Sequence, residues 1–271
     1  MKNFIIVTFV IIALVYTYAR FIGTSGLFIH ESEIKNKNIP DSFKDLKILH
    51  FGDLHFGRTV DFEKLKIIVN RINETKPDLV IFTGDLIDKD YVLKNGDAEN
   101  IIKELSQIKS TLGSYAVLGN HDYVIPESED ILINSDFNLL KNEFDLVYYK
   151  SMEPILLVGV DDLNEGTPDI EKAMPKENIP IFKIFLTHEP DYFREIDDYE
   201  FDVVLSGHSH NGQVRLPFIG PFKKVYGAKK YHKPFYQVGN TEIYITSGIG
   251  CSLHNVRLFN RPSMNLYHLK K

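Results

Sequence analysis

Five short segments of this 271-residue chain share one pattern, in which an apolar run ends in a tight turn that carries Asp, Asn or His. They are Gly52-Asp53-Leu54-His55, Gly84-Asp85, Gly119-Asn120-His121-Asp122, Thr187-His188 and Gly207-His208-Ser209-His210. Imidazole, carboxylate and amide oxygen together suit borderline or hard divalent cations. Residues two apart, such as Asp53 and His55, point to the same side where the chain is extended. The five segments therefore predict a metal site.

Each segment alone has a simpler explanation, because Gly-Asp after a strand is often only a turn and a single histidine is usually an ordinary surface or core residue. Together, however, the segments use half of the ten histidines of the chain. The only cysteine, Cys251, cannot form an intramolecular disulfide, and the chain has no cysteine cluster to hold zinc or iron–sulfur. Any metal must therefore be held by His, Asp, Glu or Asn.

The elements that position these segments alternate between strands and helices. Apolar runs predict strands over residues 46–51, 78–83, 114–118, 155–160, 181–187, 202–206 and 242–246. Helical spacing follows in Phe62, Leu65, Ile68, Val69 and Ile72, and again over residues 97–112. Such alternation predicts an α/β fold with a largely parallel first sheet, whose strand ends present the polar residues. The β-rich second half predicts a second sheet packed on the first.

The N-terminal segment has no charged residue from Asn3 to Ala19 and is continuously apolar. As a helix it would be about 26 Å long, which is enough to span a bilayer. The alternative is a cleaved signal peptide, for which Tyr18 and Arg20 make a poor cleavage site. We expect an uncleaved single-pass transmembrane helix over residues 1–22, a polar tether over residues 23–45 and a catalytic domain over residues 46–271. Lys2 and the free amine favour a cytoplasmic N-terminus, which would place this domain outside the cytoplasm, while Arg20, Lys35 and Lys37 favour the opposite orientation.

Charge is distributed unevenly along the chain. The net charge of −6 argues against a protein that coats nucleic acid, and no protein partner can be inferred. Between Asp202 and Glu242 there is no acidic residue, while lysines and aromatic residues alternate. This basic aromatic segment predicts either a loop that meets an anionic membrane surface or a solvated loop whose aromatic side chains pack on the domain.

The order D-x-H, G-D, G-N-H-D, H and G-H-x-H resembles the calcineurin-like metallophosphoesterase superfamily over about residues 47–269. The sequences around residues 51–58 and 207–217 resemble its YkuE-type branch of bacterial membrane-associated phosphoesterases, whose relatives include UDP-diacylglucosamine pyrophosphatases. The resemblance implies a four-layer α/β/β/α sandwich of two mixed sheets with a dinuclear metal site between them. It also implies a hydrolase of phosphodiester or pyrophosphate bonds, here with a lipid-linked substrate at the membrane.

The resemblance also implies roles for individual residues. One divalent ion would take Asp53, His55 and His210, the other Asn120, His188 and His208, with Asp85 shared and His121 beside the substrate. Such a pair of ions activates water for in-line attack on phosphorus, which leaves His121 to protonate or stabilise the leaving oxygen. Mixed nitrogen and oxygen ligation suits Mn, Fe or Zn, and the family favours Mn.

Two arginines near the motifs, Arg58 and Arg215, are candidates to bind phosphate, although both could equally be ordinary surface residues. Two other functions remain open for the same fold. A nucleotide or nucleic-acid phosphodiesterase would use the same metal chemistry, and the basic segment favours it mildly while the anchor counts against it. A non-catalytic membrane scaffold would usually have lost ligands, and here all seven candidates are present.

Overall fold

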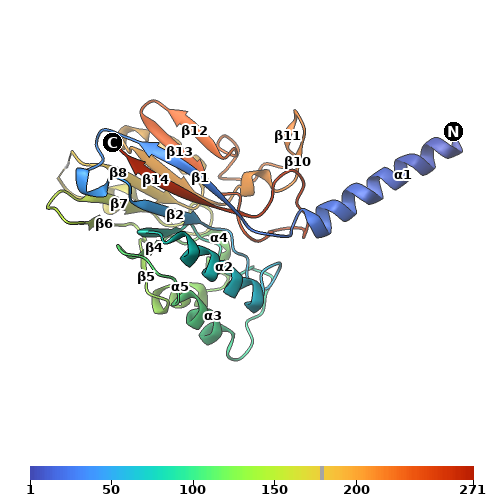
Figure 1. The fold of residues 1–271 in the computed structure, drawn as a ribbon, viewed down its shortest axis with the longest axis horizontal. Coiled ribbons are helices and arrows are strands. Elements are labelled where there is room, and N and C mark those ends of the chain that lie inside the picture. Colours follow the sequence, from blue (N-terminus) through green and yellow to red (C-terminus); the bar gives the residue numbers. More distant parts are fainter. Residues whose placement is uncertain (178–179) are drawn as a thin grey trace.

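The computed structural model, which describes residues 1–177 and 180–271, contains two six-stranded sheets stacked face to face (Figure 1). In spatial order the first sheet contains β1 (Phe28–Lys35), β14 (Ser263–Lys270), β2 (Lys47–Phe51), β3 (Leu79–Phe82), β4 (Ser114–Ala116) and β5 (Phe137–Leu139). The second contains β12 (Phe235–Val238), β13 (Thr241–Ile245), β9 (Val203–Ser206), β8 (Lys183–Thr187), β7 (Ile155–Gly159) and β6 (Glu143–Val147). Each of the strands expected from the sequence is therefore present.

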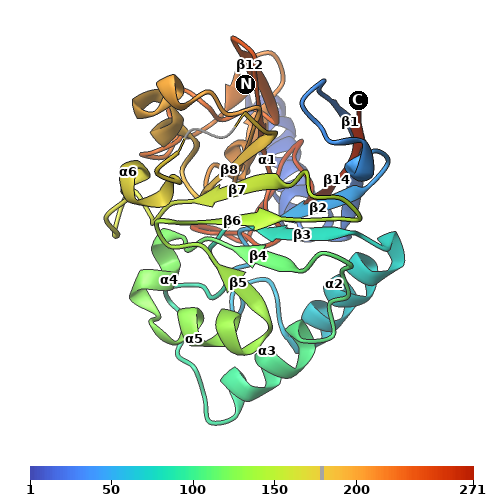
Figure 2. The same ribbon diagram turned by 90° about the vertical axis from the view of Figure 1, so that its left-hand side faces the viewer.

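The helices lie on the outer faces of the two sheets, which gives the four layers (Figure 2). The first sheet is covered by α2 (Phe62–Thr75), α3 (Asp97–Leu105) and α5 (Glu127–Asn134), while α4 (Asn120–Val124) follows β4 directly. Over the second sheet lie α6 (Ile170–Ala173) and the 3-10 helices η3 (Pro190–Glu195) and η4 (Asp197–Tyr199). Two further 3-10 turns are η2 (Asp41–Phe43) and η5 (His210–Gly212). The predicted sandwich of two mixed sheets is confirmed.

Alternation along each strand explains why the sheets stack. Leu49 on β2 packs towards the helices, whereas its neighbour Ile48 packs between the sheets. On the second sheet, Leu157 faces the first sheet and Leu156 faces the outer helices. Successive side chains of a strand point to opposite faces, so a strand that is apolar on both faces can only lie in an inner layer.

Strand directions follow the expectation of a largely parallel first sheet. From β2 to β5 the strands run parallel, and the only antiparallel neighbours in this sheet are β14 and β2. In the second sheet β7, β8, β9 and β13 run parallel, with β6 and β12 antiparallel at its edges. The carboxyl ends of the parallel strands of each sheet therefore lie at one edge, where ligands of open α/β sheets bind.

The structure differs from the expected tether at residues 23–45. Residues 28–35 form β1, which pairs in parallel with the C-terminal strand β14 from Phe28 to Lys35. Ile34 of β1 and the following Ile39 and Phe43 are fully buried between the sheets. A strand at the edge of a sheet exposes most of its side chains, so its sequence lacks the apolar run by which inner strands are recognised. The folded domain therefore begins before residue 46.

Residues 2–22 form one continuous apolar helix, made of α1 (Lys2–Thr17) and a π-helical turn η1 (Tyr18–Ile22). It projects away from the domain and is almost entirely exposed (Figure 1). Among the described residues it is the one helix long and apolar enough to cross a bilayer, a property that signal sequences share. Its base is fixed to the domain, because Arg257 N donates to Ala19 O at 2.9 Å.

We predict that the domain needs β1. A protein that starts at Gly26 should unfold cooperatively, whereas one that starts at Leu46 should lose its cooperative transition. The shorter protein lacks three fully buried apolar side chains, each worth about 1.5–3 kcal/mol, against a total stability of about 5–15 kcal/mol. Thermal unfolding followed by circular dichroism measures the difference, and equal melting temperatures would show that β1 is dispensable.

Candidate metal centre

The candidate ligands come from loops at the same edge of both sheets. Asp53 and His55 follow β2, Asp85 follows β3, and Asn120 begins α4 after β4. From the second sheet, His188 follows β8, while His208 and His210 follow β9. These loops meet where the two sheets face each other, and the candidate ligands form two adjoining clusters. Two further groups of residues that could hold an ion, one of His55, Asp85 and His121 and one of Asp162, His188 and Glu189, overlap these clusters.

The first cluster contains Asp53, His55 and His210. The Nε2 atoms of His55 and His210 face each other at 3.0 Å, and Asp53 Oδ1 lies 3.3 Å from His210 Nε2. All three side chains are buried. Three donor atoms from two sheets therefore converge on one point.

The second cluster contains His188, His208 and Asp85. His188 Nε2 lies 3.1 Å from His208 Nδ1 and 3.3 Å from Asp85 Oδ2. The same Asp85 oxygen lies 3.5 Å from His55 Nε2 in the first cluster. Asp85 therefore lies between the clusters, in the position the sequence resemblance implies for a shared ligand.

Hydrogen bonds on the far side of two histidine rings fix where their protons are. His188 Nδ1 lies 2.6 Å from Thr83 O, and His208 Nε2 lies 2.7 Å from Tyr226 O. A carbonyl oxygen only accepts, so each of these nitrogens carries the hydrogen. When both rings are neutral, the two nitrogens that face each other at 3.1 Å carry lone pairs, and a cation between them removes their repulsion. Burial opposes a charged ring, but the charges of Asp85 and Glu189 raise the pKa of His188 well above its usual value, so a second proton on His188 Nε2 and a metal ion compete for this position. Two ligands on one ion with bonds of about 2.0–2.1 Å have this separation at a roughly right angle.

Further atoms also fit a cation. Asp53 Oδ2 and Asn120 Oδ1 are buried without a hydrogen-bond partner. Burial lowers the pKa of His208 to about 3 and that of His210 well below its usual value, so both rings are neutral and able to ligate. Burial, together with the charge of Asp85, raises the pKa of Asp53 to about 6. These are the properties of a ligand set that a divalent cation would neutralise.

The backbone at this centre is unusual. Positive φ values occur at Asp53 (50°), His55 (47°), Asp85 (61°), His208 (63°) and His210 (46°). Non-glycine residues adopt this left-handed region at a cost of about 1–3 kcal/mol each. Hydrogen bonds between the loops stabilise this conformation. Asp53 N donates to Gly84 O and His208 N donates to Asp53 Oδ1, both at 2.9 Å.

Glycine is required where two of these loops touch. A Cβ on Gly119 would lie 2.5 Å from Asp85 Oδ1, and one on Gly84 would lie 2.5 Å from Gly119 N. Gly84 also has a φ of 87°. The glycines of the G-D and G-N-H-D segments thus permit the close approach of the loops that carry Asp85 and Asn120.

His121 lies beside the clusters but is oriented differently. Lys89 N donates to His121 Nδ1 at 3.0 Å, so this nitrogen accepts and the neutral ring carries its hydrogen on Nε2. Burial lowers the pKa of His121 to about 4, which favours the neutral ring. Its ring stands edge-on to His55, with 4.5 Å between the centroids. A nitrogen that bears hydrogen cannot ligate a metal, so His121 is suited to donate a hydrogen bond.

Sequence reasoning missed Asp88, although its spacing of three residues from Asp85 could have suggested it. Its carboxylate is buried and lies 3.3 Å from His55 Nδ1 and 2.8 Å from Arg58 Nε. Burial favours the neutral carboxyl, but the contacts with His55 and Arg58 lower the pKa of Asp88 to about 2. A carboxylate beside one nitrogen of a histidine ring keeps the hydrogen on that nitrogen and leaves the other nitrogen free to bind a metal.

Asp122, the last residue of the G-N-H-D segment, holds the backbone of the neighbouring loop. The structure gives no contact between its carboxylate and the ring of His121. Instead the carboxylate accepts hydrogen bonds from the backbone N–H groups of Asp85, Leu86 and Gly119, at 2.8–2.9 Å. It therefore joins the loop of Asp85 to the start of α4, and this explains how Asp85 is held.

Arg257 is a second residue that sequence patterns did not reveal, because it lies in an irregular loop. It is fully buried, and its guanidinium donates to the carbonyl oxygens of Gly248 and Gly250. The same nitrogen is 3.3 Å from His210 Nδ1. Arg257 therefore holds the loop that packs against His210.

The two arginines proposed for phosphate differ. Arg58 contacts the carboxylates of Asp88 and Asp90 and donates to Leu253 O at 3.1 Å. A guanidinium that two carboxylates already neutralise is poorly suited to bind phosphate, so the structure supports a positioning role for Arg58 instead. Arg215 donates to Asn211 O at 2.7 Å, and its part in binding stays a prediction.

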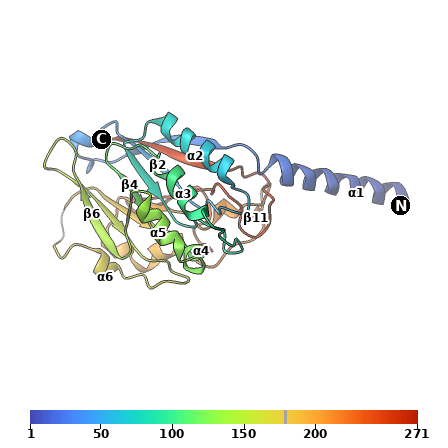
Figure 3. The ribbon, with the colours of Figure 1, turned by 90° about the horizontal axis from the view of Figure 1, so that it is seen from below.

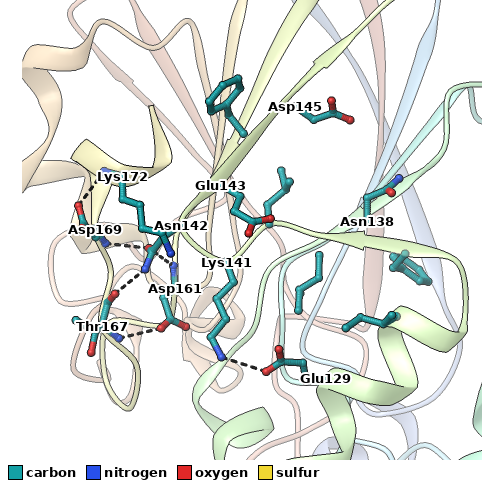
Figure 4. Close-up of a pocket in the computed structure, with 15 residues that line it drawn as sticks. Glu129, Asn138, Lys141, Asn142, Glu143, Asp145, Asp161, Thr167, Asp169 and Lys172 are labelled. Atoms are coloured by element: carbon teal, nitrogen blue, oxygen red, sulfur yellow. Dashed lines mark hydrogen bonds and ion pairs between the residues drawn. The ribbon is translucent and has the colours of Figure 1, made fainter. Parts of the chain in front are cut away.

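A wide cavity of about 880 Å³ lies elsewhere, along β5 and β6 (Figure 4). Its polar residues are bound to one another, since the side chain of Asn142 joins Asp161, Thr167 and Asp169, and Lys141 contacts Glu129. None of the candidate ligands lines it. A smaller cavity of about 210 Å³ is lined by His208 and His210 and opens beside the clusters.

Comparison with known proteins agrees with this geometry. The family model for calcineurin-like phosphoesterases matches residues 46–212. The chain is 33% identical to the uncharacterised metallophosphoesterase YkuE of Bacillus subtilis over 94% of its length and 90% of that protein. It is 30% identical to the phosphodiesterase YaeI of Escherichia coli, over 84% of each chain.

Two more distant likenesses add to these. The UDP-2,3-diacylglucosamine pyrophosphatase LpxG of Chlamydia muridarum is 28% identical over 64% of this chain and 66% of that protein. The solved structure of an NAD nucleotidase from Haemophilus influenzae matches 74% of this chain and 44% of its own, with a TM-score of 0.50 and 16% identity. At that identity the structural match supports the fold alone.

We predict that Asp88→Asn weakens binding of Mn²⁺ by about 10–100-fold, because the carboxylate behind His55 is lost. The matched control is Asp90→Asn, which removes a second partner of Arg58 but no contact with His55. Isothermal titration with the metal-free proteins measures both affinities. Equal affinities of the two variants would show that Asp88 does not act through His55.

Proposed function

This chain belongs to the calcineurin-like phosphoesterase family, and from that premise we propose that it hydrolyses phosphodiester or pyrophosphate bonds of a lipid-linked substrate with two divalent metal ions. That it is a hydrolase of phosphate esters follows from its family. The use of two ions, the identity of the ligands and the nature of the substrate are our proposals.

One observation carries the dinuclear proposal. The facing nitrogens of His188 and His208 lie 3.1 Å apart, and the opposite nitrogen of each ring donates to a backbone carbonyl. Both facing nitrogens therefore offer lone pairs to a metal ion once it displaces the second proton of His188. Asp85 connects this pair to the corresponding pair of His55 and His210. We therefore assign Asp53, His55 and His210 to one ion, Asn120, His188 and His208 to the other, and Asp85 to both.

Bound divalent ions would supply a water nucleophile near neutral pH and would neutralise the phosphoryl oxygens. The residues of the chain then have to hold and orient the substrate. We propose Mn for both positions, since these nitrogen and oxygen ligands suit it and the family favours it, with Fe and Zn as alternatives.

His121 is suited to stabilise the leaving oxygen by hydrogen bonding. Because His121 Nδ1 accepts a hydrogen bond from Lys89 N, the neutral ring carries its hydrogen on Nε2 and can donate it to the leaving oxygen. A neutral imidazole of this kind donates a hydrogen bond to developing negative charge without first having to be protonated. Of the two roles considered from the sequence, stabilisation is therefore favoured over proton transfer.

The lipid-linked substrate is supported by the position of the apolar helix. The helix leaves the domain beside the small hairpin of β10 (Arg215–Leu216) and β11 (Gly220–Pro221) (Figures 1 and 3). The relative LpxG is named for a lipid pyrophosphate substrate. We propose that α1 anchors the protein, uncleaved, with the domain outside the cytoplasm. Resistance to carbonate extraction tests the anchor, and protease access to the domain in intact cells tests the side.

The basic aromatic segment is partly buried and partly exposed in the structure. Tyr231 is buried and packs near Phe193, as the alternative of a packed loop expects. Phe218, Ile219 and Phe222 are instead strongly exposed on and beside the β10–β11 hairpin. Tyr226 and Phe235 of the segment are also exposed. The place of the hairpin next to α1 supports contact of this part with a membrane.

We predict that Asp85→Asn lowers turnover of a p-nitrophenyl phosphodiester by about a thousandfold or more and reduces bound Mn, because the shared carboxylate serves both ions. Turnover and metal content by mass spectrometry are measured on the same sample. Near-normal turnover with full metal content would contradict the dinuclear assignment.

His121→Ala is the companion variant. It should keep both ions and lose rate mainly on alkyl esters, since a p-nitrophenolate leaving group needs little stabilisation. Equal losses on both kinds of ester would argue against a role for His121 at the leaving oxygen. If neither wild-type protein nor variants hydrolyse any ester with Mn, the scaffold alternative gains.

A further inference from the structure

Two neighbouring cavities, together called the groove, lie between the candidate metal centre and the N-terminal helix. The inner cavity, of about 210 Å³, is lined by His208 and His210 and also by Val214 and Val256. The outer cavity, of about 550 Å³, lies between α1 and the domain. Val214, His254 and Val256 line both cavities, so the two lie next to each other.

The outer part of the groove has an apolar wall on each side. From α1 come Ile11, Ile12 and Val15, which lie on one face of the helix at spacings of three and four residues. From the domain come Val214, Val256 and Leu258. These side chains of α1 are largely exposed although the domain lies beside them, which leaves room between helix and domain.

The base of the groove is held in place relative to the metal centre. Arg257 donates its backbone N–H to Ala19 O, and its side chain lies 3.3 Å from His210 Nδ1. Gly23 packs so closely that a Cβ there would overlap Arg257 O. One residue thus contacts both the end of the apolar helix and a candidate ligand, so the groove keeps its position between them.

We propose that this groove binds the acyl or alkyl chain of the substrate while its phosphate lies at the metal centre. The inference rests on the proposed function and specifies the substrate as a phosphoester with a single chain next to the scissile phosphate. Lys223 lines the inner cavity together with His208 and His210, so its positive charge is available to an anionic phosphate there. The outer end opens along α1, so a chain could pass from the bilayer into the groove without crossing water.

Chain-length dependence tests this assignment. We use full-length protein in nanodiscs with Mn and compare methyl, butyl and octyl p-nitrophenyl phosphate, which share one leaving group. Wild-type KM should fall with chain length, by up to about fourfold for each methylene that leaves water. A KM that does not depend on chain length would overturn the proposal. Failure to hydrolyse even the methyl ester would instead overturn the proposed function.

Neighbouring residues of one helix provide the matched variants. Val15→Trp fills the outer groove, whereas Leu14→Trp adds the same side chain on a residue that does not line it. We expect Val15→Trp to raise KM for the octyl ester about tenfold and Leu14→Trp to leave it unchanged. Equal KM values for the two variants would show that the chain is bound elsewhere or only by the bilayer.

A binding measurement without turnover completes the test. Hexadecyl phosphate with a diazirine at the chain end is irradiated with the wild-type protein, and the labelled peptides are identified by mass spectrometry. Label should appear in residues 11–16 and 252–258 and be displaced by unlabelled hexadecyl phosphate. Label restricted to α1, or label in 252–258 that is not displaced, would contradict a specific site.

Discussion

The convergence of buried imidazoles and carboxylates from both sheets is the constraint on which this structure depends. Neither His188 nor His208 can turn its hydrogen inward, because each has it bound to a backbone carbonyl on the far side. Asp85 then connects this pair to His55, which the opposite sheet contributes. Such a group of buried carboxylates and facing nitrogens needs positive charge beside it, which a second proton on His188 or a bound metal ion supplies. The two sheets therefore meet at the point where the ligands of the metal centre must meet.

Much of the surrounding structure serves to hold these side chains in place. The left-handed conformations of Asp53 and Asp85 are costly, and the hydrogen bonds that hold them come from other loops of the centre. Asp122 accepts from three backbone N–H groups, Asp88 lies behind His55, and Arg257 holds the loop at His210. None of these three residues is a candidate ligand, yet each holds a candidate ligand or its loop in place. Positions of this kind tune metal affinity without contacting the metal.

The sequence predicted the inner strands and candidate ligands because an apolar strand followed by a polar turn is a local pattern. It did not predict β1, since an edge strand such as Phe28–Lys35 is largely exposed and depends on pairing with the distant β14. Asp88 and Arg257 were missed because their importance depends on contacts with His55 and His210 that no spacing reveals. The partners of Arg58 were missed for the same reason. Contacts between residues far apart in the chain could therefore not be predicted from the sequence.

Anomalous diffraction from crystals grown with Mn²⁺ tests the central claim most directly. Data collected on both sides of the manganese absorption edge locate each ion independently of any activity. The account predicts two peaks per chain, one between His55 and His210 and the other between His188 and His208, with Asp85 contacting both. A single peak, or two peaks of which either lies away from Asp85, would contradict a centre organised around one shared carboxylate.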